Sequence, residues 1–187
     1  ELRASIGYVF QFAALFDSMT VGDNIRLGLR RHGLDPDEVA TRVRESLHLV
    51  DLDGAEARYP AELSGGMRKR VGIARAIALR PRYILYDEPT TGLDPVTSAV
   101  IDELMVRTRQ ELGVTSVVVT HDMRSAYTVG TRIAMLYEGT VRQVGTVEEI
   151  KHSTDPIVRQ FIEGRAELGP VDEPMVGAGI PAATPAA

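Results

Sequence analysis

The sequence predicts a mixed α/β fold in which parallel strands alternate with helices. Two short apolar runs support this prediction, "YILY" at 83–86 and "SVVV" at 116–119. A helical stretch separates them, and the order strand, helix, strand favours a doubly wound parallel sheet. The length of 187 residues suits one domain with its own core, or one domain that carries an inserted lobe.

Composition indicates a folded protein and argues against several classes of function. Apolar residues make up 44% of the chain and charged residues 25%, as in ordinary globular domains. The net charge of −5 provides no basic footprint, so we expect no nucleic acid as a partner. Cysteine is absent, which excludes disulfides and thiolate metal sites. The apolar runs are far shorter than the roughly 18 residues that a membrane-spanning helix needs.

The first part of the chain predicts a strand followed by a helical lobe. "SIGYVF" is a β-branched and aromatic run, which indicates a buried strand ending at Gln11. Capping patterns begin at Thr20 and at Asp35, and Pro36 suits the first turn of a helix. Apolar residues then recur at helical spacing at Val39, Val43, Leu47 and Val50. We expect residues of about 12–80 to form this lobe.

The later elements have clear start and stop signals. Asp94 and Pro95 predict the beginning of a helix and Gly113 its end, so that 88–121 forms one βαβ unit. "RIAMLYEGTVRQVG" then predicts two strands joined by a Glu-Gly turn. Beyond Gly164 the chain is rich in Pro, Gly and Ala, so we expect a disordered tail.

Polar residues follow both strands of the βαβ unit. Asp87 and Glu88 end the first strand, and His121 follows the second. Because ligands bind beyond the carboxyl ends of parallel strands, we expect these side chains at one edge of the sheet. Side chains alternate along a strand, so one acid can hold a cation while the other addresses water. An isolated Asp-Glu pair is more often a solvent-exposed strand end or cap, but the preceding strand, the proline and the histidine favour a functional site.

A glycine pair precedes a helix that opens with three cations, in the stretch "AELSGGMRKRVGIARAI" at 61–77. Ser64 suits the N-cap, and Gly65 and Gly66 expose backbone N–H groups that no Cβ shields. An anion can therefore approach the positive end of the helix, which predicts a phosphate seat. The alternative is a plain turn before an amphipathic helix on which 68–70 form a solvated face.

These motifs together resemble the nucleotide-binding subunit of ATP-binding cassette (ABC) transporters, over residues of about 6–165. Gln11 resembles the Q-loop, "LSGGM" at 63–67 the signature motif, and "YILYDE" at 83–88 the Walker B strand. "TGLD" at 91–94 resembles the D-loop, and His121 the switch histidine. The resemblance implies a P-loop NTPase-type parallel sheet with an inserted ABC-type helical subdomain.

The resemblance also implies catalytic and metal-binding roles in the hydrolysis of ATP. Asp87 would help to hold Mg²⁺, and Gln11 would sense the metal and water. Glu88 would be the general base or a water-orienting carboxylate, and His121 would contact the γ-phosphate. Gln11 would also link the chemistry to a membrane partner.

The signature motif implies that the site is shared between two subunits. Ser64, Gly65 and Gly66, with Asp94 of the D-loop, would bind ATP held by a second ATPase subunit. An integral membrane permease would be the other partner. "FAALFDSMT" would line the groove that receives this permease, and core packing of Phe12, Leu15 and Phe16 is the alternative of equal weight.

Within the family, three stretches look closest to ATPases that move phospholipid or sterol with Mce-domain partner proteins. They are "QFAALFDSMTVGDNI", "YPAELSGGMRKRV" and "LYDEPTTGLDPVTS". The segment 159–171 is similar to the C-terminal extension of those ATPases. The resemblance therefore implies lipid traffic, driven from the cytoplasmic face of the inner membrane, with a lipid-binding Mce-domain protein as a further partner.

The 187 residues contain no G-x-x-x-x-G-K-[ST], the Walker A loop that cradles phosphates. Because the chain starts at Glu1 without a Met, we expect this loop and its strand to lie upstream. We also expect the chain alone to be inactive.

The implied division is a truncated nucleotide-binding domain at 1–165, with its catalytic core at 1–11 and 81–150, and an extension and tail at 151–187. Three alternatives remain: a non-catalytic donor of the signature motif, an importer ATPase for another substrate, and a soluble ATPase of DNA repair or translation.

Overall fold

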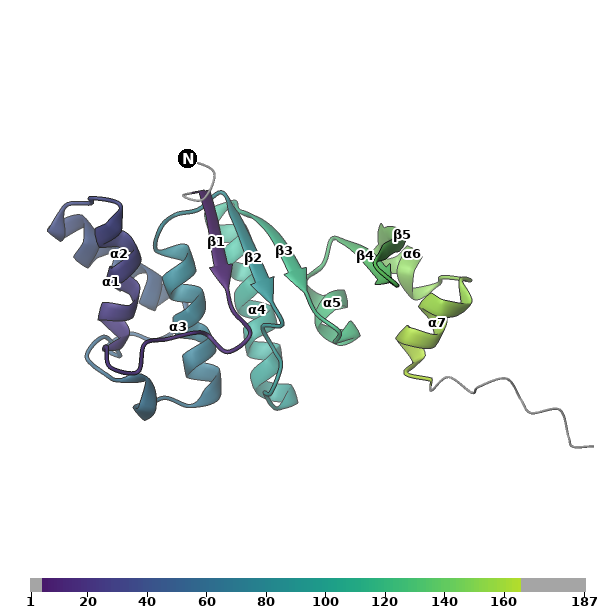
Figure 1. Cartoon of the computed structure of the whole chain (residues 1–187), viewed down its shortest axis with the longest axis horizontal. Coiled ribbons are helices and arrows are strands. Elements are labelled where there is room, and N and C mark those ends of the chain that lie inside the picture. Colours follow the sequence, from purple (N-terminus) through teal and green to yellow (C-terminus); the bar gives the residue numbers. More distant parts are fainter. Residues whose placement is uncertain (1–4, 166–187) are drawn as a thin grey trace, which may run out of the picture. The chain divides into compact units, whose positions relative to one another are not determined.

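The computed structural model describes residues 5–165, and the chain divides into two compact units (Figure 1). The first unit ends at Ile133 and the second begins at Ala134. The strands of the first unit are β1 (Ile6–Val9), β2 (Tyr83–Asp87) and β3 (Thr115–Val119). Its helices are α1 (Val21–Arg31), α2 (Pro36–Leu49), α3 (Gly65–Ile77), α4 (Pro95–Leu112), α5 (Met123–Val129) and the short 3-10 helix η2 (Pro60–Glu62).

The strands β1, β2 and β3 form a parallel sheet in that order. β2, α4 and β3 make the predicted βαβ unit, so the predicted α/β class with a parallel sheet is confirmed. The side chain of Asp94 caps α4 by accepting the backbone N–H groups of Val96 and Thr97. Gly113 ends the helix in a left-handed conformation, which only glycine adopts without strain.

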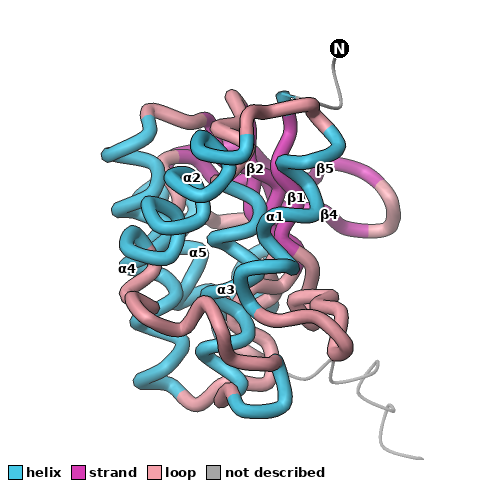
Figure 2. The backbone as a smooth tube through the Cα atoms, turned by 90° about the vertical axis from the view of Figure 1, so that its left-hand side faces the viewer, coloured by secondary structure: helices cyan, strands magenta, loops and turns pink. Residues whose placement is uncertain are grey.

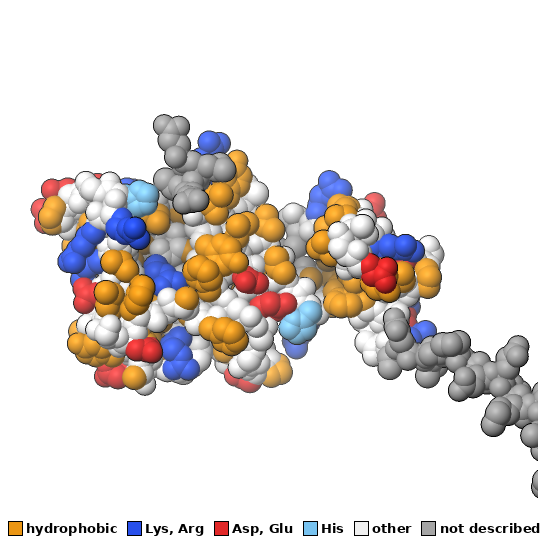
Figure 3. Space-filling model, viewed as in Figure 1, with side chains coloured by type: hydrophobic (Ala, Val, Ile, Leu, Met, Phe, Trp, Pro, Cys, Tyr) orange, Lys and Arg blue, Asp and Glu red, His pale blue; other side chains and the backbone are white. Residues whose placement is uncertain are grey.

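The two faces of this sheet differ in their cover. Val9, Ile84 and Tyr86 are buried, and Figure 2 shows α2, α3 and α4 on one side of β1 and β2. On the opposite face, Tyr8 is 40% exposed and Val117 is 54% exposed. Apolar side chains gather over this part of the first unit in Figure 3. Among the described residues of the first unit, helices therefore pack against one face of the sheet and leave the other bare.

The helices α1 and α2 pack on each other and on α3. Thr20 caps α1 and Asp35 caps α2, each accepting a backbone N–H of the first turn, as the sequence predicts. The apolar residues at helical spacing along α2 are buried: Val39, Val43, Leu47 and Val50. Because α3 also packs on β1, this helix connects the group of helices to the sheet.

The second unit begins within β4 (Arg132–Tyr137), which pairs with β5 (Thr140–Thr146). Glu138 and Gly139 join the two strands with positive φ angles of 46° and 75°, the geometry of a tight hairpin turn. The predicted pair of strands with a Glu-Gly turn is confirmed. The helices α6 (Val147–Lys151) and α7 (Pro156–Glu163) follow.

The first strand is shorter than the sequence predicts. β1 ends at Val9, and the N–H of Ala13 donates to the carbonyl of Phe10 at 3.0 Å, so Gln11 lies in a turn. The predicted tail and residues 166–171 of the predicted extension lie outside the described residues. Within residues 5–165, no helix has both the length and the apolar character to cross a membrane.

Candidate active site

The residues predicted to carry chemistry gather where the parallel strands end. Gln11 follows β1, Glu88 follows β2 and His121 follows β3. α3 begins at the same end of the first unit, where the strand arrowheads lie in Figure 1, so Ser64 and Gly65 belong to this end too. One edge of the sheet therefore carries acids, an imidazole and the start of a helix.

Glu88 lies at the centre of this edge. Its φ is +45°, which is uncommon for a residue with a Cβ, and its N–H donates to the carbonyl of Val119 at 2.9 Å. The carboxylate lies between two partners: Thr91 Oγ1 donates to Oε2 at 2.9 Å, and His121 Nδ1 is 2.9 Å from Oε1. The ends of β2 and β3 are thereby joined by a carboxylate and imidazole pair.

This contact shifts the pKa values of both side chains. Burial acts to raise the pKa of Glu88, but hydrogen bonds from His121 and Thr91 and the charge of His121 outweigh it, so this pKa falls below its ordinary value. The hydrogen bond to Glu88 and the charge of that carboxylate raise the pKa of His121 above its ordinary value. At neutral pH Glu88 is ionised, and the His121 ring takes a proton more readily than a free histidine.

Asp87 has a different partner from its neighbour Glu88. The hydroxyl of Tyr8, which comes from the adjacent strand β1, donates to Oδ2 of Asp87 at 3.2 Å. The two acids therefore have separate environments, as the sequence predicts, although Glu88 lies beyond the end of β2 with a positive φ and strand alternation is not the cause.

Ser64 and the glycine pair form the first turn of α3. Ser64 Oγ accepts the N–H of Met67 at 3.2 Å, which confirms the predicted N-cap. Gly65 and Gly66 are the first two residues of the helix, where backbone N–H groups have no partner within the helix. Ser64 is exposed and Gly65 is half-buried, so this end of α3 is open to an anion.

The second glycine has a packing role that the sequence does not reveal. A Cβ on Gly66 would lie 2.5 Å from Cγ2 of Thr97, whereas a Cβ on Gly65 would lie 3.6 Å from the nearest atom of Leu93. Thr97 in turn donates its hydroxyl to Asp94, at 2.5 Å from Oδ2. The signature turn therefore packs directly on the capped start of α4.

The three consecutive cations of α3 do not form a solvated face. Arg68 donates to the carbonyl of Leu63 at 2.6 Å, and Arg70 donates to two carbonyls at the end of α2 at 3.0 and 2.9 Å. Lys69 is only 7% exposed and donates to the carbonyls of Gln11 and Glu88. Each cation is therefore hydrogen-bonded to the backbone of a different segment.

The donor set at the strand ends fits one Mg²⁺ ligand from the protein. Within residues 5–165, no three His, Asp or Glu side chains are grouped to hold a metal ion by themselves. Mg²⁺ needs only one or two carboxylates in nucleotide sites, because water and phosphates supply the other ligands. Asp87, at the end of β2 and apart from the pair of Glu88 and His121, fits that demand.

The turn after Gln11 exposes aromatic side chains. Phe12 is 81% exposed and Phe16 is 51% exposed, whereas Leu15 packs against the core. Core packing is therefore correct for Leu15 and wrong for the two phenylalanines.

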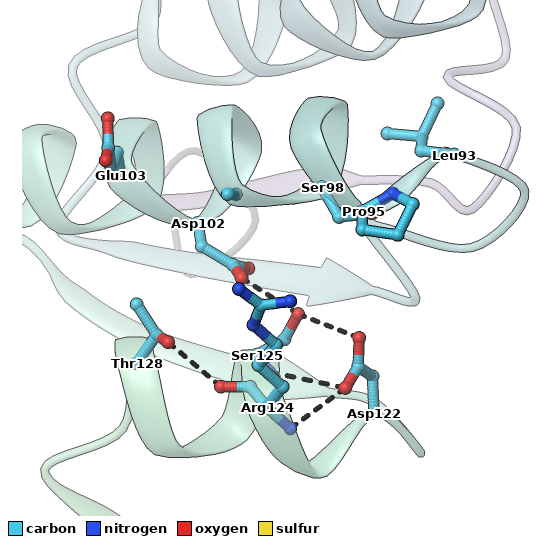
Figure 4. Close-up of a pocket in the computed structure, with 10 residues that line it drawn as sticks. Leu93, Pro95, Ser98, Asp102, Glu103, Asp122, Arg124, Ser125 and Thr128 are labelled. Carbon is cyan, nitrogen blue, oxygen red and sulfur yellow. Dashed lines mark hydrogen bonds between the residues drawn. The ribbon is translucent and has the colours of Figure 1, made fainter.

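A cavity of about 280 Å³ lies between α4 and α5 (Figure 4). Asp102 on α4 is 4% exposed, and it accepts a hydrogen bond from Ser125 Oγ at 3.0 Å. Its other oxygen, Oδ1, has no hydrogen-bond partner among the described residues. Burial, opposed by the hydrogen bond from Ser125, raises the pKa of Asp102.

Sequence reasoning missed three residues that contact the predicted site: Tyr8, Thr91 and Lys69. Thr91 lies three residues after Glu88 in a turn, a spacing at which side chains can meet. Lys69 shares one helical face with the buried residues Gly66 and Ile73, and this spacing was a signal that the lysine is buried. Tyr8 is marked by no pattern, because its contact depends on the register of β1 against β2.

The chain is similar to known proteins in sequence and in fold. The pattern that describes the ABC transporter family matches residues 1–91. The chain is 42% identical over 172 residues to the probable ribonucleotide transport ATP-binding protein mkl of Mycobacterium leprae, which covers 91% of this chain and 49% of that protein. These likenesses show that the chain is similar to the ATP-binding proteins of ABC transporters. The chain spans about half the length of the curated relatives it matches.

Two solved structures have the same fold. One is the dimeric post-hydrolysis structure of the ATP-binding cassette MJ0796 with ADP and Pi, at a TM-score of 0.67 and 37% identity, covering 76% of this chain and 63% of that one. The other is CbiO1 from Clostridium perfringens, described as part of the ABC transporter complex CbiONQ. Its TM-score is 0.76 at 31% identity, covering 86% of this chain and 64% of that one.

Proposed function

We propose that the protein is the nucleotide-binding part of an ABC transporter and hydrolyses ATP to drive transport. The observation that carries this proposal is the carboxylate of Glu88, held between Thr91 and His121 at the end of β2. Asp87, the acid available to a metal ion, precedes it directly. A carboxylate, a metal ligand and an imidazole at one sheet edge are the groups that transfer of a phosphoryl group to water requires.

In this proposal Glu88 orients the water that attacks the γ-phosphate of ATP. Its lowered pKa keeps it ionised at neutral pH, so it accepts a hydrogen bond from water but is a weak base, which suits orientation better than complete proton removal. His121 turns Nδ1 to Glu88, so Nε2 is the atom that faces the phosphate, and it donates to the phosphate while the ring is protonated. Asp87, together with Gln11, would hold Mg²⁺, which would supply charge neutralisation.

A second ATPase subunit completes the proposed site. The open first turn of α3, with Ser64, Gly65 and Gly66, binds the phosphates of ATP held by the partner subunit. Asp94 acts beside it, because Thr97 joins this cap of α4 to the signature turn. The dimeric state of the solved relative with ADP and Pi supports this part of the proposal.

An integral membrane permease is the second proposed partner. Phe12 and Phe16 expose apolar surface directly after Gln11, and side chains of this kind are enriched at protein interfaces. The backbone of the same turn is held by Lys69, which also contacts the Glu88 carbonyl. A permease bound at this turn on the cytoplasmic face of the inner membrane is thus positioned to sense hydrolysis.

We propose phospholipid or a related lipid as the transported substrate, with an Mce-domain protein as a further partner. The support is the likeness of the three stretches around Gln11, the signature motif and the Walker B strand to lipid-moving ATPases. The name of the relative from Mycobacterium leprae gives ribonucleotide transport instead, so an importer of another substrate is the main competing proposal.

The test uses the full-length protein reconstituted with its permease in phospholipid vesicles. We expect Mg²⁺-dependent ATP hydrolysis that Glu88→Gln abolishes while labelled ATP still binds. If the wild-type protein hydrolyses nothing alone but restores hydrolysis when mixed with an intact ABC ATPase, the non-catalytic alternative is favoured. Transfer of labelled phospholipid supports the lipid proposal, and uptake of labelled ribonucleotide without lipid transfer overturns it.

A further inference from the structure

We propose that Lys69 is a positioning residue that ties the turn after β1 to the turn after β2, so that both move as one body with α3. Its ammonium group donates to the backbone carbonyl of Gln11 and, at 3.2 Å, to that of Glu88. The importance of this tie for hydrolysis rests on the proposed function, but the mechanical tie itself does not.

The burial of Lys69 indicates that its hydrogen bonds are needed by the fold. The lysine is 7% exposed, and a buried ammonium group is costly unless hydrogen bonds replace its lost water. Both acceptors are neutral backbone carbonyls, and the Glu88 carboxylate contributes only a longer-range attraction. The fold therefore accepts the desolvation cost of a charged group at a position where this group bridges two segments.

The two bridged turns have strained backbones that need external support. Ala13, Ala14 and Glu88 have φ angles of 59°, 47° and 45°, a region that residues with a Cβ adopt only when their surroundings hold them there. Lys69 is hydrogen-bonded within each turn, at Gln11 and at Glu88. Loss of the ammonium group would therefore weaken the support of both turns together.

A second cation of α3 provides a natural control. Arg75 donates to the carbonyls of Ala13 and Ala14 at 2.7 and 2.6 Å, and Gly72 lets α3 approach, because a Cβ there would lie 3.3 Å from Cβ of Ala13. Lys69, Gly72 and Arg75 thus lie along one face of α3. Arg75 holds only the turn after β1, whereas Lys69 holds both.

The test compares Lys69→Met with Arg75→Met in the full-length protein without nucleotide, by amide hydrogen exchange. Methionine keeps the length of the side chain and removes the donors. In Lys69→Met we expect exchange at the amides of Ala13 and Glu88 to quicken by roughly ten- to a hundredfold, as expected for the loss of a hydrogen bond from a charged donor. In Arg75→Met we expect the increase at Ala13 alone. Val21, the first residue of α1, donates its amide to the carbonyl of Arg58 at 2.8 Å. The exchange rate of this amide should not change in either variant.

Several results would overturn the proposal. One is faster hydrogen exchange in only one of the two turns of Lys69→Met. Another is an equal increase of the exchange rate at all amides of this variant. If Lys69→Met does not fold, hydrogen exchange of the unmodified protein provides the test. The amides of Ala13 and Glu88 should then open with the same free energy and the same urea dependence. Different values for the two amides contradict the tie. Lys69→Arg, which keeps charged donors, should retain most of the protection.

Kinetics separates a positioning role from a loss of binding. Because Lys69 contacts only the backbone carbonyls of the site residues Gln11 and Glu88, Lys69→Met should lower kcat for ATP with KM little changed, and Lys69→Arg should recover part of kcat. A raised KM with unchanged kcat contradicts the proposal. If the wild-type protein shows no hydrolysis, the proposed function fails, while the exchange data still decide whether the tie exists.

Discussion

His121 Nδ1 lies 2.9 Å from Oε1 of Glu88, and this contact joins the ends of two neighbouring parallel strands. Both groups titrate, so the contact exists as an ion pair only while Glu88 is ionised and His121 is protonated. The shifted pKa values set the pH window in which the ion pair exists. It extends from below 4.5, the ordinary value of a glutamate, to above 6.5, the ordinary value of a histidine.

The pKa of His121 should fall in Glu88→Gln. The hydrogen bond and charge of Glu88 raise it in the wild-type protein, and glutamine removes the charge. NMR titration of the His121 ring should therefore give a midpoint above 6.5 in the wild type and a lower one in the variant. His32, which lies at the end of α1, serves as the internal control. Equal midpoints for His121 in both proteins would disprove the ion pair.

The same pair makes folding stability depend on pH at both ends of the window. The raised pKa of His121 contributes stability that is present below 6.5 and is lost as pH rises through the folded value. The lowered pKa of Glu88 contributes stability that is present above 4.5 and is lost as pH falls through the folded value. Thermal unfolding of wild type and His121→Gln should differ most between these limits.

Glu88→Gln should reduce turnover by about 10² to 10⁴ through loss of the carboxylate alone, while ATP binding persists. The amide lacks the negative charge with which Glu88 orients water, although it keeps the shape of the side chain. Steady-state hydrolysis and equilibrium binding of labelled ATP measure the two effects. Glu111→Gln, at an exposed position on α4, should leave both unchanged. Hydrolysis at the wild-type rate in Glu88→Gln would move the catalytic role to another residue.

The two signature glycines should respond differently to alanine. Gly65→Ala should fold normally, because its Cβ meets only ordinary contacts, whereas Gly66→Ala should collide with Cγ2 of Thr97 and cost about 1–3 kcal/mol. Thr97→Ser removes that methyl and keeps the hydroxyl that bonds Asp94, so the double variant should recover most of the loss. Urea unfolding of the four proteins measures this. A stable Gly66→Ala protein would contradict the packing at the start of α4.

Asp102→Asn should stabilise the protein at neutral pH more than at acidic pH. Burial raises the pKa of Asp102 against the effect of the Ser125 hydrogen bond, so its protonated form is favoured in the fold. The wild type therefore loses stability as pH rises through this raised pKa, and asparagine avoids the ionisation. Thermal unfolding at acidic and neutral pH tests the prediction. Asp122→Ala should destabilise instead, because Asp122 caps α5 and alanine offers no acceptor to the first turn.

Phe12→Ser should leave stability within about 0.5 kcal/mol of the wild type, because the ring is 81% exposed. If the permease binds this turn, the same change should weaken its affinity for the ATPase about tenfold or more, as loss of an aromatic anchor does. Pull-down and calorimetric titration with the purified permease measure this. Val96→Ser removes another exposed side chain, 75% exposed on α4, and should not affect the permease. Unchanged affinity in Phe12→Ser would exclude this turn from the interface.

The parts of the fold that local chemistry determines could be predicted from the sequence. The caps at Thr20, Asp35, Ser64 and Asp94 and the turn at 138–139 follow from side chains and backbone preferences that act within a few residues. The apolar runs predict β2 and β3 because strands buried in parallel sheets are continuously hydrophobic.

Contacts between segments distant in the chain could not be predicted from the sequence. The sequence predicts Lys69 as one of three surface cations, yet its hydrogen-bond partners, the carbonyls of Gln11 and Glu88, lie 58 and 19 residues away along the chain. Tyr8 reaches Asp87 across 79 residues through strand register. The glycine pair in the sequence predicts only phosphate access, whereas the structure places Thr97 against Gly66. Each of these depends on how the helices pack on the sheet, which residue patterns along the chain do not encode.

The bare face of the sheet affects how the isolated chain should behave in solution. Val117 and Val119 are more than half exposed, and Tyr8 and Tyr83 add aromatic surface beside them. Contiguous apolar surface of this kind promotes self-association, and an edge strand adds unpaired backbone groups that recruit further chains. Purification should therefore succeed best at low concentration or with mild detergent, and an environment-sensitive dye should fluoresce with the native chain before any heating.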